Sequence, residues 1–217
     1  MSPRTKKQNE SIREQRKQEI LRAAIQVYAA KGYSAAALSD VAERAGLANG
    51  LVYYYFKSKQ KLFRELYEYM MDQSLRYTTA YFDQDVPVLE QFQKYAALIC
   101  ERVIEDPETQ HFYMRIVLDL HHLYEPGELS PFDWMKNFIQ PMTQAIDRGI
   151  EQGVIRRGDA YLMAMQFWGA VSQGMNYLDQ FVQDLETQDL TATKKNDEVR
   201  AKIRQIAESA ILFFKQE

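Results

Sequence analysis

The sequence predicts an all-α protein with a basic N-terminal domain and a larger, acidic helical domain. Apolar residues recur at intervals of three and four along most of the 217 residues, which is the periodicity of amphipathic helices. Pro and Gly separate these segments, as at Asp106-Pro107 and Pro126-Gly127, where helices are expected to end. The residues through Arg64 carry thirteen Lys and Arg against five Asp and Glu, whereas the remainder carries fourteen against twenty-five. We therefore expect about nine helices, divided between domains at 12–64 and 65–217.

The composition is that of an ordinary globular protein and argues against several classes. No run approaches the ~18 apolar residues that span a bilayer, so we expect no membrane partner. The polar N-terminus lacks the apolar core of a signal peptide. The single cysteine, Cys100, cannot form an internal disulfide and fits a reducing compartment. These features predict a cytoplasmic protein in which Cys100 is a small buried apolar residue rather than a redox sensor.

The first helix is expected at 12–31, after a polar tail that is not expected to be ordered alone. Its apolar residues fall on one face, and Gly32 follows as a stop signal. The tail cations Arg4, Lys6 and Lys7 suit contacts along a DNA backbone, and a solubilising role fits them equally well. The residues expected on the inner face are Ile20, Ala23, Ala24, Val27 and Tyr28.

Two short helical segments meet at Gly46. Residues 38–45 repeat their apolar positions every three or four residues, which defines one helical face. Gly46 follows directly, where a left-handed cap costs glycine least. Val52 and Phe56 then give the second segment a buried stripe, because they are four residues apart. A short helix, a glycine turn and a second short helix are typical of a helix-turn-helix.

Residues 46–59 read GLANGLVYYYFKSK, and the segment SDVAERA precedes them. This run resembles the N-terminal DNA-binding domain of the TetR/AcrR family of transcriptional repressors, and the resemblance extends over residues 16–64. It implies a three-helix DNA-binding domain followed by a helical domain for effector binding and dimerisation. Hydroxyl or imidazole side chains that many members carry are replaced at four positions, namely Ala36, Ala37, Ala48 and Tyr55.

The second motif helix carries the predicted base contacts. Asn49 can pair bidentately with adenine, Gly50 permits close backbone approach, and Leu51 can contact a thymine methyl group. By resemblance, the three tyrosines and Lys59 hold phosphates or flanking bases, and Lys57 adds charge. Core packing is the alternative for any one tyrosine, but three in succession cannot all face inward. The predicted DNA-binding residues are Ser39, Asn49, Gly50, Leu51, Tyr53, Tyr54, Tyr55, Lys57 and Lys59.

The rest of the chain reads as a series of helices. A long one at 59–82 is expected to link the two domains, so that movement in one can tilt the other. A polar loop is expected at 187–196, and Pro141 should bend the helix that contains it. The remaining helices are expected at 88–104, 108–124, 132–152, 160–185 and 197–214.

The last two helices are candidates for a homodimer interface. One has a small-residue face at Gly169, Ala170, Ser172 and Gly174, which would let another backbone approach closely. Burial within one subunit explains the apolar stripe of the other helix equally well. The resemblance implies a four-helix contact built from both helices of each subunit. That stripe comprises Val199, Ile203, Ile206, Ala207, Ala210, Phe213 and Phe214.

Aromatic and methionine side chains on inward faces of the larger domain are, by resemblance, candidates to line an effector cavity. Such side chains suit a bulky apolar or aromatic compound, and a plain hydrophobic core is the alternative. His111, His121 and His122 are expected to be surface or hydrogen-bonded residues, and no metal or other cofactor is expected. The predicted ligand-binding residues are Tyr95, Ile99, Phe112, Tyr113, Ile116, Trp134, Phe138, Met142, Phe167, Trp168 and Met175.

These features predict a dimeric regulator that binds a palindromic operator in double-stranded DNA and is released by a small-molecule effector. The residues fit an activator as well as a repressor. An all-helical adapter, whose basic end meets an acidic protein or membrane surface, is an alternative, and a helical enzyme is another. No nucleophile stands near a base in a recognisable pattern, so we expect no enzymatic activity.

Overall fold

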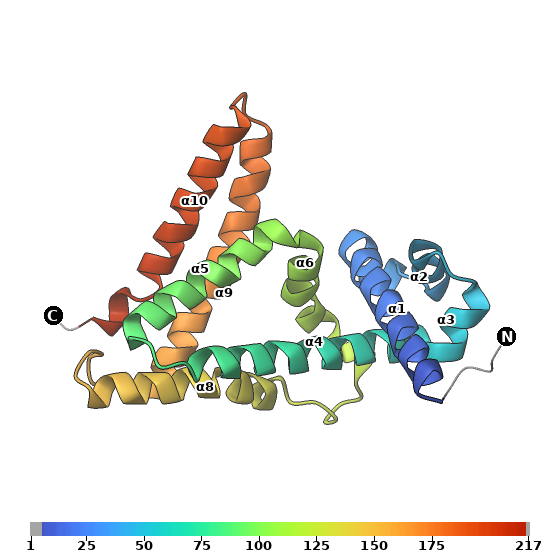
Figure 1. The fold of residues 1–217 in the computed structure, drawn as a ribbon, viewed down its shortest axis with the longest axis horizontal. Coiled ribbons are helices and arrows are strands. Elements are labelled where there is room, and N and C mark those ends of the chain that lie inside the picture. The colour runs from blue at the N-terminus through green and yellow to red at the C-terminus, as the bar shows by residue number, and fades with distance from the viewer. Residues whose placement is uncertain (1–5, 216–217) are drawn as a thin grey trace. The chain divides into compact units, whose positions relative to one another are not determined.

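A computed structural model describes residues 6–215, without the side chains of Lys6, Asn9 and residues 131–133. All regular elements in this part of the chain are helical, which confirms the predicted fold class (Figure 1). The elements are α1 (Lys6–Ala35), α2 (Leu38–Ala45), α3 (Asn49–Phe56), α4 (Lys59–Phe82), α5 (Val88–Glu105), α6 (Pro107–Ile116), η1 (Val117–Asp119), α7 (Leu120–Leu123), α8 (Pro131–Glu151), α9 (Ala160–Glu186), α10 (Ala192–Ser209) and η2 (Leu212–Phe214).

The helices form two units, each with a core of its own. The first unit comprises Met1–Asp72 and Glu108–Leu129, and the second comprises Gln73–Pro107 and Ser130–Glu217. The helix α4 begins in the first unit and ends in the second. The DNA-binding domain expected at 12–64 lies within the first unit, and its limits stay a prediction.

The core of the first unit is centred on Tyr28. The predicted inner face of α1 is buried throughout, and the Tyr28 ring lies 5.7 Å from Phe63 and 5.0 Å from Phe112. The Tyr28 hydroxyl donates to Oδ2 of Asp119 at 2.7 Å. Burial and the adjacent Asp119 carboxylate raise the pKa of this hydroxyl well above its usual value. The segment after α5 therefore packs against α1 and α4.

The helix α1 begins at Lys6, so the prediction of a tail before residue 12 is wrong from that residue onward. Side-chain pairs on successive turns support the polar part of α1, including Gln18 to Glu14 at 2.9 Å and Arg16 to Glu19 at 2.6 Å. Arg4, predicted to follow a DNA backbone, lies outside the described residues.

The segment at 108–124 is not the single helix that its periodicity predicts. The helix α6 ends at Ile116, and three residues of 3-10 helix separate it from the short α7. Asp119, the last residue of η1, has φ −99° and ψ 2° and accepts the hydrogen bond from Tyr28. A tertiary contact to a residue 91 positions away thus coincides with the change in helix type, and no Pro or Gly marks it in the sequence.

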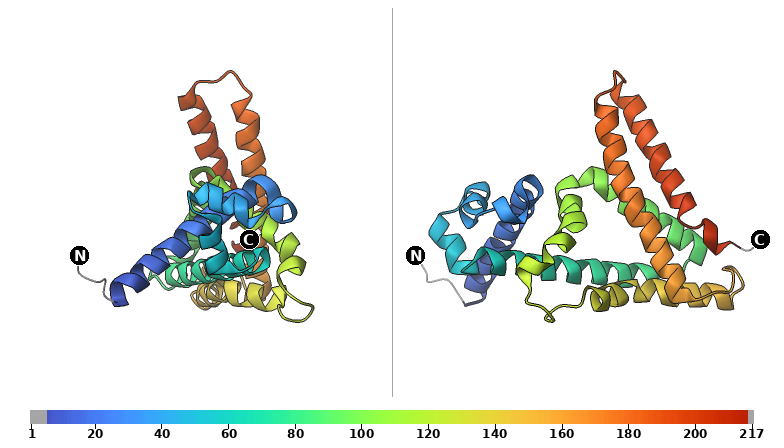
Figure 2. Two further views of the ribbon diagram at one scale, coloured as in Figure 1. Left: turned by 90° about the vertical axis from the view of Figure 1, so that its right-hand side faces the viewer. Right: turned by 180° about the vertical axis from the view of Figure 1, so that it is seen from behind.

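The core of the second unit is centred on Phe92 of α5. Its ring lies 4.8 Å from Phe82, 4.7 Å from Phe167 and 4.9 Å from Phe214, which joins α4, α5, α9 and η2. Cys100 is buried in the same core, as predicted. The helices α9 and α10 lie side by side as a hairpin, whose tip extends past α5 (Figures 1 and 2).

The loop expected at 187–196 is shorter than predicted, because α10 begins at Ala192. Thr191 is its N-cap, and its hydroxyl accepts a hydrogen bond from the backbone N–H of Lys194 at 3.4 Å. The helix expected to run to Phe214 ends at Ser209, and η2 follows. The N–H of Arg156 donates to the carbonyl oxygen of Phe214 at 3.0 Å, which holds this end of the chain on the unit.

Candidate nucleic-acid interface

The first motif helix, α2, is fixed on the first unit by its apolar face. Leu38, Val41 and Ala42 are buried, as predicted. Asp40 accepts a hydrogen bond from the N–H of Ala37 at 3.0 Å and forms an ion pair with Lys31 at 3.0 Å. The Lys31 ammonium and this backbone bond hold the pKa of Asp40 below its usual value. The Asp40 carboxylate thus supplies one half of a capping box, and the other half is missing because the alanine at the N-cap has no side-chain acceptor.

Gly46 ends α2 in the left-handed conformation, with φ 66° and ψ 31°. The N–H of Leu47 donates to the carbonyl of Ala42 at 2.9 Å, and that of Gly46 to Glu43 at 3.1 Å. The bond across six residues is the one that a Schellman cap makes. The predicted turn between the two motif helices is therefore present, with the residue type that this backbone favours.

The second motif helix, α3, buries one face and leaves the other open. Val52 and Phe56 are 0% and 2% exposed, whereas Tyr53 and Tyr54 are 52% and 60% exposed. Tyr55 is half-buried, so the three successive tyrosines do face in different directions. Of the other predicted contacts, Ser39, Asn49, Gly50 and Lys57 are exposed, and Leu51 is half-buried.

The two lysines after α3 have different surroundings. The Lys57 Nζ lies 5.1 Å from the centre of the exposed Tyr54 ring. The Lys59 Nζ instead donates to the carbonyl oxygens of Tyr33 at 2.9 Å and Ser34 at 3.1 Å. Two of the three donors of Lys59 are therefore occupied within the unit, and one is left for a phosphate.

A network that sequence reasoning missed joins α2 and α1 to α6. Arg44 on α2 donates to Oε1 of Gln26 at 2.7 Å, and Gln26 donates to Oε2 of Glu108 at 2.8 Å. Arg44 also lies 3.8 Å from Glu108. Gln26 and Glu108 are 82 residues apart, so no local pattern could have indicated the contact.

The three histidines of the α6–α7 segment have no metal site around them. The described residues contain no group of three or more His, Cys, Asp or Glu side chains that could hold a metal ion. The ring of His122 stacks on Tyr33 at 4.9 Å, and Nδ1 of His121 lies 3.0 Å from the carbonyl oxygen of Leu118. In the described part of the chain, no helix has an apolar stretch long enough to cross a bilayer.

The predicted ligand-binding residues do not all belong to one unit. Phe112, Tyr113 and Ile116 lie in the first unit, where Phe112 packs against Tyr28. In the second unit, Trp134 stacks on Phe138 at 5.0 Å, and Phe138 contacts Trp168 at 4.6 Å. The other second-unit members share the same core, with the two tryptophans packed on its margin: Tyr95, Ile99, Met142, Phe167 and Met175.

The two surfaces predicted to form the dimer interface differ in exposure: the one on α10 is mostly buried, and the one on α9 is partly exposed. Most of the apolar stripe of α10 is buried within its own unit, including Ile203, Ile206 and Ala210. A Cβ atom at Gly174 would collide with Cγ2 of Ile206, so Gly174 serves the packing of α10 in the same chain. On α9, Gly169 and Ala170 are exposed. They lie on one helical face with the exposed apolar residues Leu162, Met165 and Tyr177.

Comparison with known proteins gives the same interpretation as the motif. The family model of bacterial regulatory proteins, tetR family, matches residues 20–66. The chain is 38% identical to the HTH-type transcriptional regulator YfiR of Bacillus subtilis over 76 residues. The matched part covers 35% of this chain and 36% of that relative, so each protein is matched over about a third of its length. It is 25% identical to the fatty acid metabolism regulator protein of the same species over 158 residues, covering 71% of this chain and 79% of the relative.

The fold agrees over nearly the whole chain. The transcriptional regulator FadR of Bacillus subtilis, solved in complex with stearoyl-CoA, superposes with a TM-score of 0.68 at 19% identity, covering 90% of this chain and 98% of FadR. A TetR-family regulator from Mesorhizobium loti superposes with a TM-score of 0.65 at 18% identity, covering 94% and 98%. Residues 20–66 therefore match the tetR family of bacterial regulatory proteins, and the chain as a whole has the fold of solved TetR-family regulators.

Proposed function

We propose that two copies of this chain bind a palindromic operator in the cytoplasm and act as a repressor that a small apolar or aromatic effector releases. The observation that carries the proposal is the open face of α3. Its stripe of Val52 and Phe56 is buried, while Asn49, Gly50 and Tyr54 face outward. A helix that enters a major groove needs this division, because its exposed N-terminal residues contact the base edges.

The roles of the exposed side chains follow from their chemistry. Asn49 offers the amide that pairs bidentately with adenine, and the half-buried Leu51 can reach a thymine methyl group. Tyr53, Tyr54 and Lys57 surround these residues with donors suited to phosphate oxygens. Most of the affinity would then come from phosphate contacts, and the sequence preference from the first turn of α3.

A dimer would present two copies of α3 to the DNA, which doubles the small number of base contacts that one copy can make. The exposed face of α9, with Leu162, Met165, Gly169 and Ala170, supports a contact between two copies. Small residues at its centre allow close approach of a second helix, and Tyr177 extends the face toward the tip of the hairpin. A two-fold axis requires half-sites about one helical turn apart, or a multiple of it.

The side chains in the core of the second unit favour an apolar effector. Its core combines phenylalanine, tryptophan and methionine side chains, which pack readily around irregular apolar shapes. One relative of similar length regulates fatty acid metabolism, and FadR was solved with stearoyl-CoA, a ligand with a long apolar chain. Release from DNA requires that the effector bind one spacing of the DNA-binding units more tightly than another.

Gel shifts of the full-length protein on DNA upstream of its own gene test the proposal. We expect a complex on a palindromic sequence that survives an excess of random competitor DNA. A thermal-shift screen with fatty acids, acyl-CoA esters and aromatic compounds should then identify a compound that dissociates the complex. Binding that random DNA removes completely would refute the proposal and favour the adapter alternative.

A further inference from the structure

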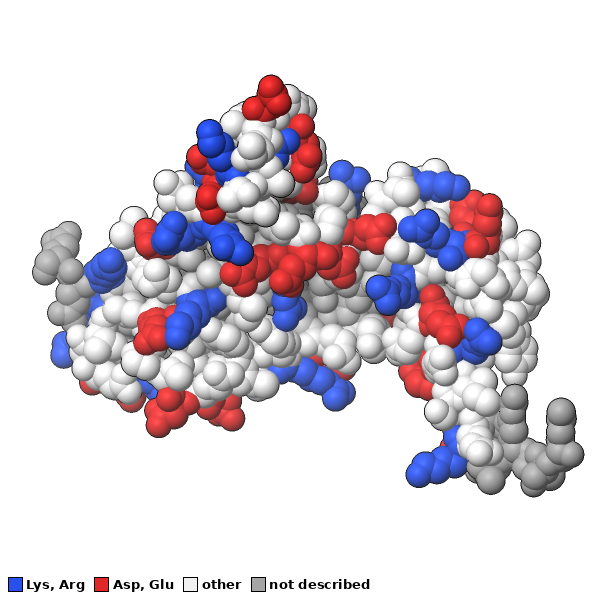
Figure 3. Space-filling model, turned by 45° about the horizontal axis from the view of Figure 1, so that its top comes forward, with Lys and Arg blue, Asp and Glu red and all other residues white. Residues whose placement is uncertain are grey.

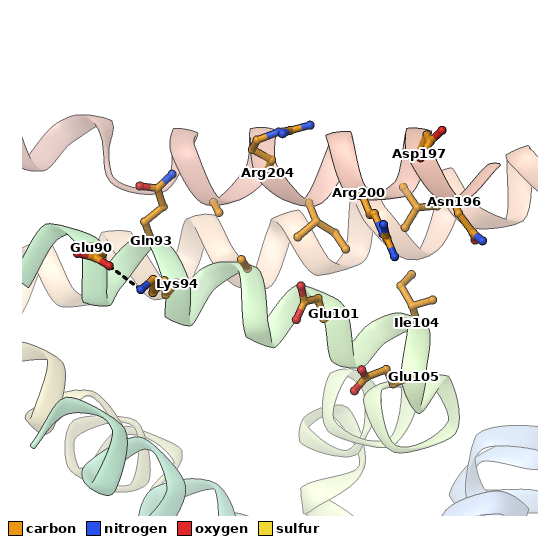
Figure 4. Close-up of a pocket in the computed structure, with 14 residues that line it drawn as sticks. Glu90, Gln93, Lys94, Glu101, Ile104, Glu105, Asn196, Asp197, Arg200 and Arg204 are labelled. Atoms are coloured by element: carbon orange, nitrogen blue, oxygen red, sulfur yellow. Dashed lines mark ion pairs between the residues drawn. The ribbon is translucent and has the colours of Figure 1, made fainter. Parts of the chain in front are cut away.

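A groove of about 1100 Å³ runs along the outer side of the second unit, between α5 and α10 (Figure 4). None of the predicted effector-binding residues lines it, although Ile203 and Ala207 at its base belong to the core of the second unit. Its volume lies just above the range of pockets that hold drug-sized ligands, which are about 300–1,000 Å³. The size and elongated walls favour a peptide over a small molecule.

The two walls of the groove differ in charge, although the α10 wall also carries Asp197 beyond Arg200. On the α5 wall, Glu101 and Glu105 are one helical turn apart, and on the α10 wall, Arg200 and Arg204 have the same spacing. In the described part of the chain, none of these four has an ion-pair partner within 4.0 Å. Figure 3 shows that acidic and basic side chains lie next to one another on the face of the protein that it displays.

One end of the α5 wall is neutral. Glu90 and Lys94 form an ion pair at 2.5 Å within α5, so they cancel each other (Figure 4). The unpaired charges are thus concentrated at the other end of the groove. There, the charge of each wall is available to an occupant of opposite sign.

The floor of the groove is apolar. Ile203 and Ala207 of α10 lie at its base but are only 6% and 1% exposed, so the accessible apolar surface comes mainly from the half-buried Ala97 and Val199 and from Ile104. Ile104 is 41% exposed, which is high for an isoleucine, and its side chain points toward α10 in Figure 4. Small and branched apolar residues between two parallel ridges provide a seat for an apolar stripe.

From these features we infer that the groove binds an amphipathic helix of a partner protein, with basic residues along one edge of its apolar stripe and acidic residues along the other. A helix with its side chains is about 10–12 Å across and lies between two supporting helices in the same way as in other helix-in-groove complexes. Its basic edge would lie beside Glu101 and Glu105, and its acidic edge beside Arg200 and Arg204. Reversing the direction of the peptide exchanges its edges, so only one direction satisfies both walls.

Three synthetic helical peptides with the same leucine stripe test the inference by fluorescence anisotropy on the full-length protein. One has a lysine edge and a glutamate edge, one has lysine on both edges, and one has glutamate on both. We expect the mixed peptide to bind about tenfold more tightly than either other peptide, since each exposed ion pair changes affinity several-fold.

Charge reversal of one wall should change the preference in a defined way. R200E/R204E makes both walls acidic and should bind the lysine peptide best, whereas E101K/E105K should bind the glutamate peptide best. K136E/R157E is the matched control, because both residues are exposed and lie outside the groove. It should keep the preference for the mixed peptide.

Each variant is expected to bind one peptide, so a positive result also shows that the variant is folded. If the wild-type protein binds none of the three peptides, or all three equally, the inference is wrong. An unchanged preference in both wall variants would likewise place the peptide elsewhere. DNA binding does not enter the readout, so the outcome is independent of the proposed operator contacts.

Discussion

Lys59, the first residue of α4, donates a hydrogen bond of 2.9 Å to the carbonyl oxygen of Tyr33. Its Nζ also lies 4.5 Å from the centre of the Tyr33 ring and 3.1 Å from the carbonyl of Ser34. Gly32 has φ 70° and ψ 175°, which breaks the regular geometry of α1 immediately before these carbonyls. A lysine predicted to hold phosphate therefore also joins the end of α1 to the start of α4.

Replacing Lys59 by Met should lower the stability of the protein. The change removes two hydrogen bonds from a charged donor and a cation–π contact, and partial exposure reduces their value. We expect the free energy of unfolding to fall by about 1 kcal/mol. Urea denaturation measures this, with Lys57→Met as a control of identical chemistry. Equal midpoints for the two variants would show that the Tyr33 contact contributes nothing.

Replacing Lys57 by Gly should increase the stability of the protein, in contrast to the replacement of Lys59. It has φ 51°, the only positive value among non-glycine residues in the described chain. Its ψ of −35° lies outside the left-handed helical region, so Lys57→Gly should raise the free energy of unfolding by less than about 1 kcal/mol, through loss of the Cβ that positive φ disfavours. The same variant loses a cation beside the motif, so the salt dependence of DNA binding should decrease by about one unit of slope. If the variant is more stable but the salt dependence of its DNA binding is unchanged, Lys57 does not contact DNA.

The two glycines of α9 should respond differently to the same substitution. Gly174→Ala introduces a Cβ that collides with Ile206, and overpacking of this kind costs about 1–3 kcal/mol. Gly169 has no heavy atom of its own chain within 4 Å of an added Cβ, so Gly169→Ala should cause no collision within the chain. Thermal unfolding compares the two. In an Ile206→Ala background, the cost of Gly174→Ala should disappear, and its persistence would contradict the packing that we describe.

The Cys100 thiol should be unreactive in the folded protein. Burial, and to a smaller extent Glu101, raises the pKa of this thiol to about 12, so the nucleophilic thiolate is scarce at pH 8. A thiol reagent should label Cys100 only after unfolding in urea. Because the folded pKa exceeds the value of about 8.5 in an unfolded chain, the contribution of Cys100 to stability is complete below about pH 8.5 and is lost as the pH rises toward 12. Rapid labelling of the native protein would contradict this burial.

Periodicity predicted the faces of the helices but not which faces meet. The inner face of α1 and the stripe of Val52 and Phe56 are buried as expected, because a repeat of three and four residues places side chains on one side of a helix. Nothing local indicates that Tyr28 bonds to Asp119 or that Gln26 bonds to Glu108, so the packing of the α6–α7 segment against α1 could not be predicted.

The motif was the most predictable part of the site. Gly46 has the left-handed backbone that its position before α3 required, and the exposure of Tyr53 and Tyr54 follows from helical geometry. The start of α10 was missed, although Thr191 is a recognisable N-cap residue. The bonds of Lys59 were missed for another reason, since a lysine on a basic motif looks like a phosphate contact until its neighbours in space are known.

The central claim is that α3 reads bases with Asn49, and operator binding by Asn49→Ala tests it most directly. Affinity should be measured against a series of operators in which each base pair of both half-sites is changed in turn. The account predicts that the variant loses about tenfold of its discrimination at one base pair, at symmetric positions in the two half-sites, and keeps it elsewhere. An equal loss of affinity on operator and random DNA, with discrimination unchanged at every position, would contradict it.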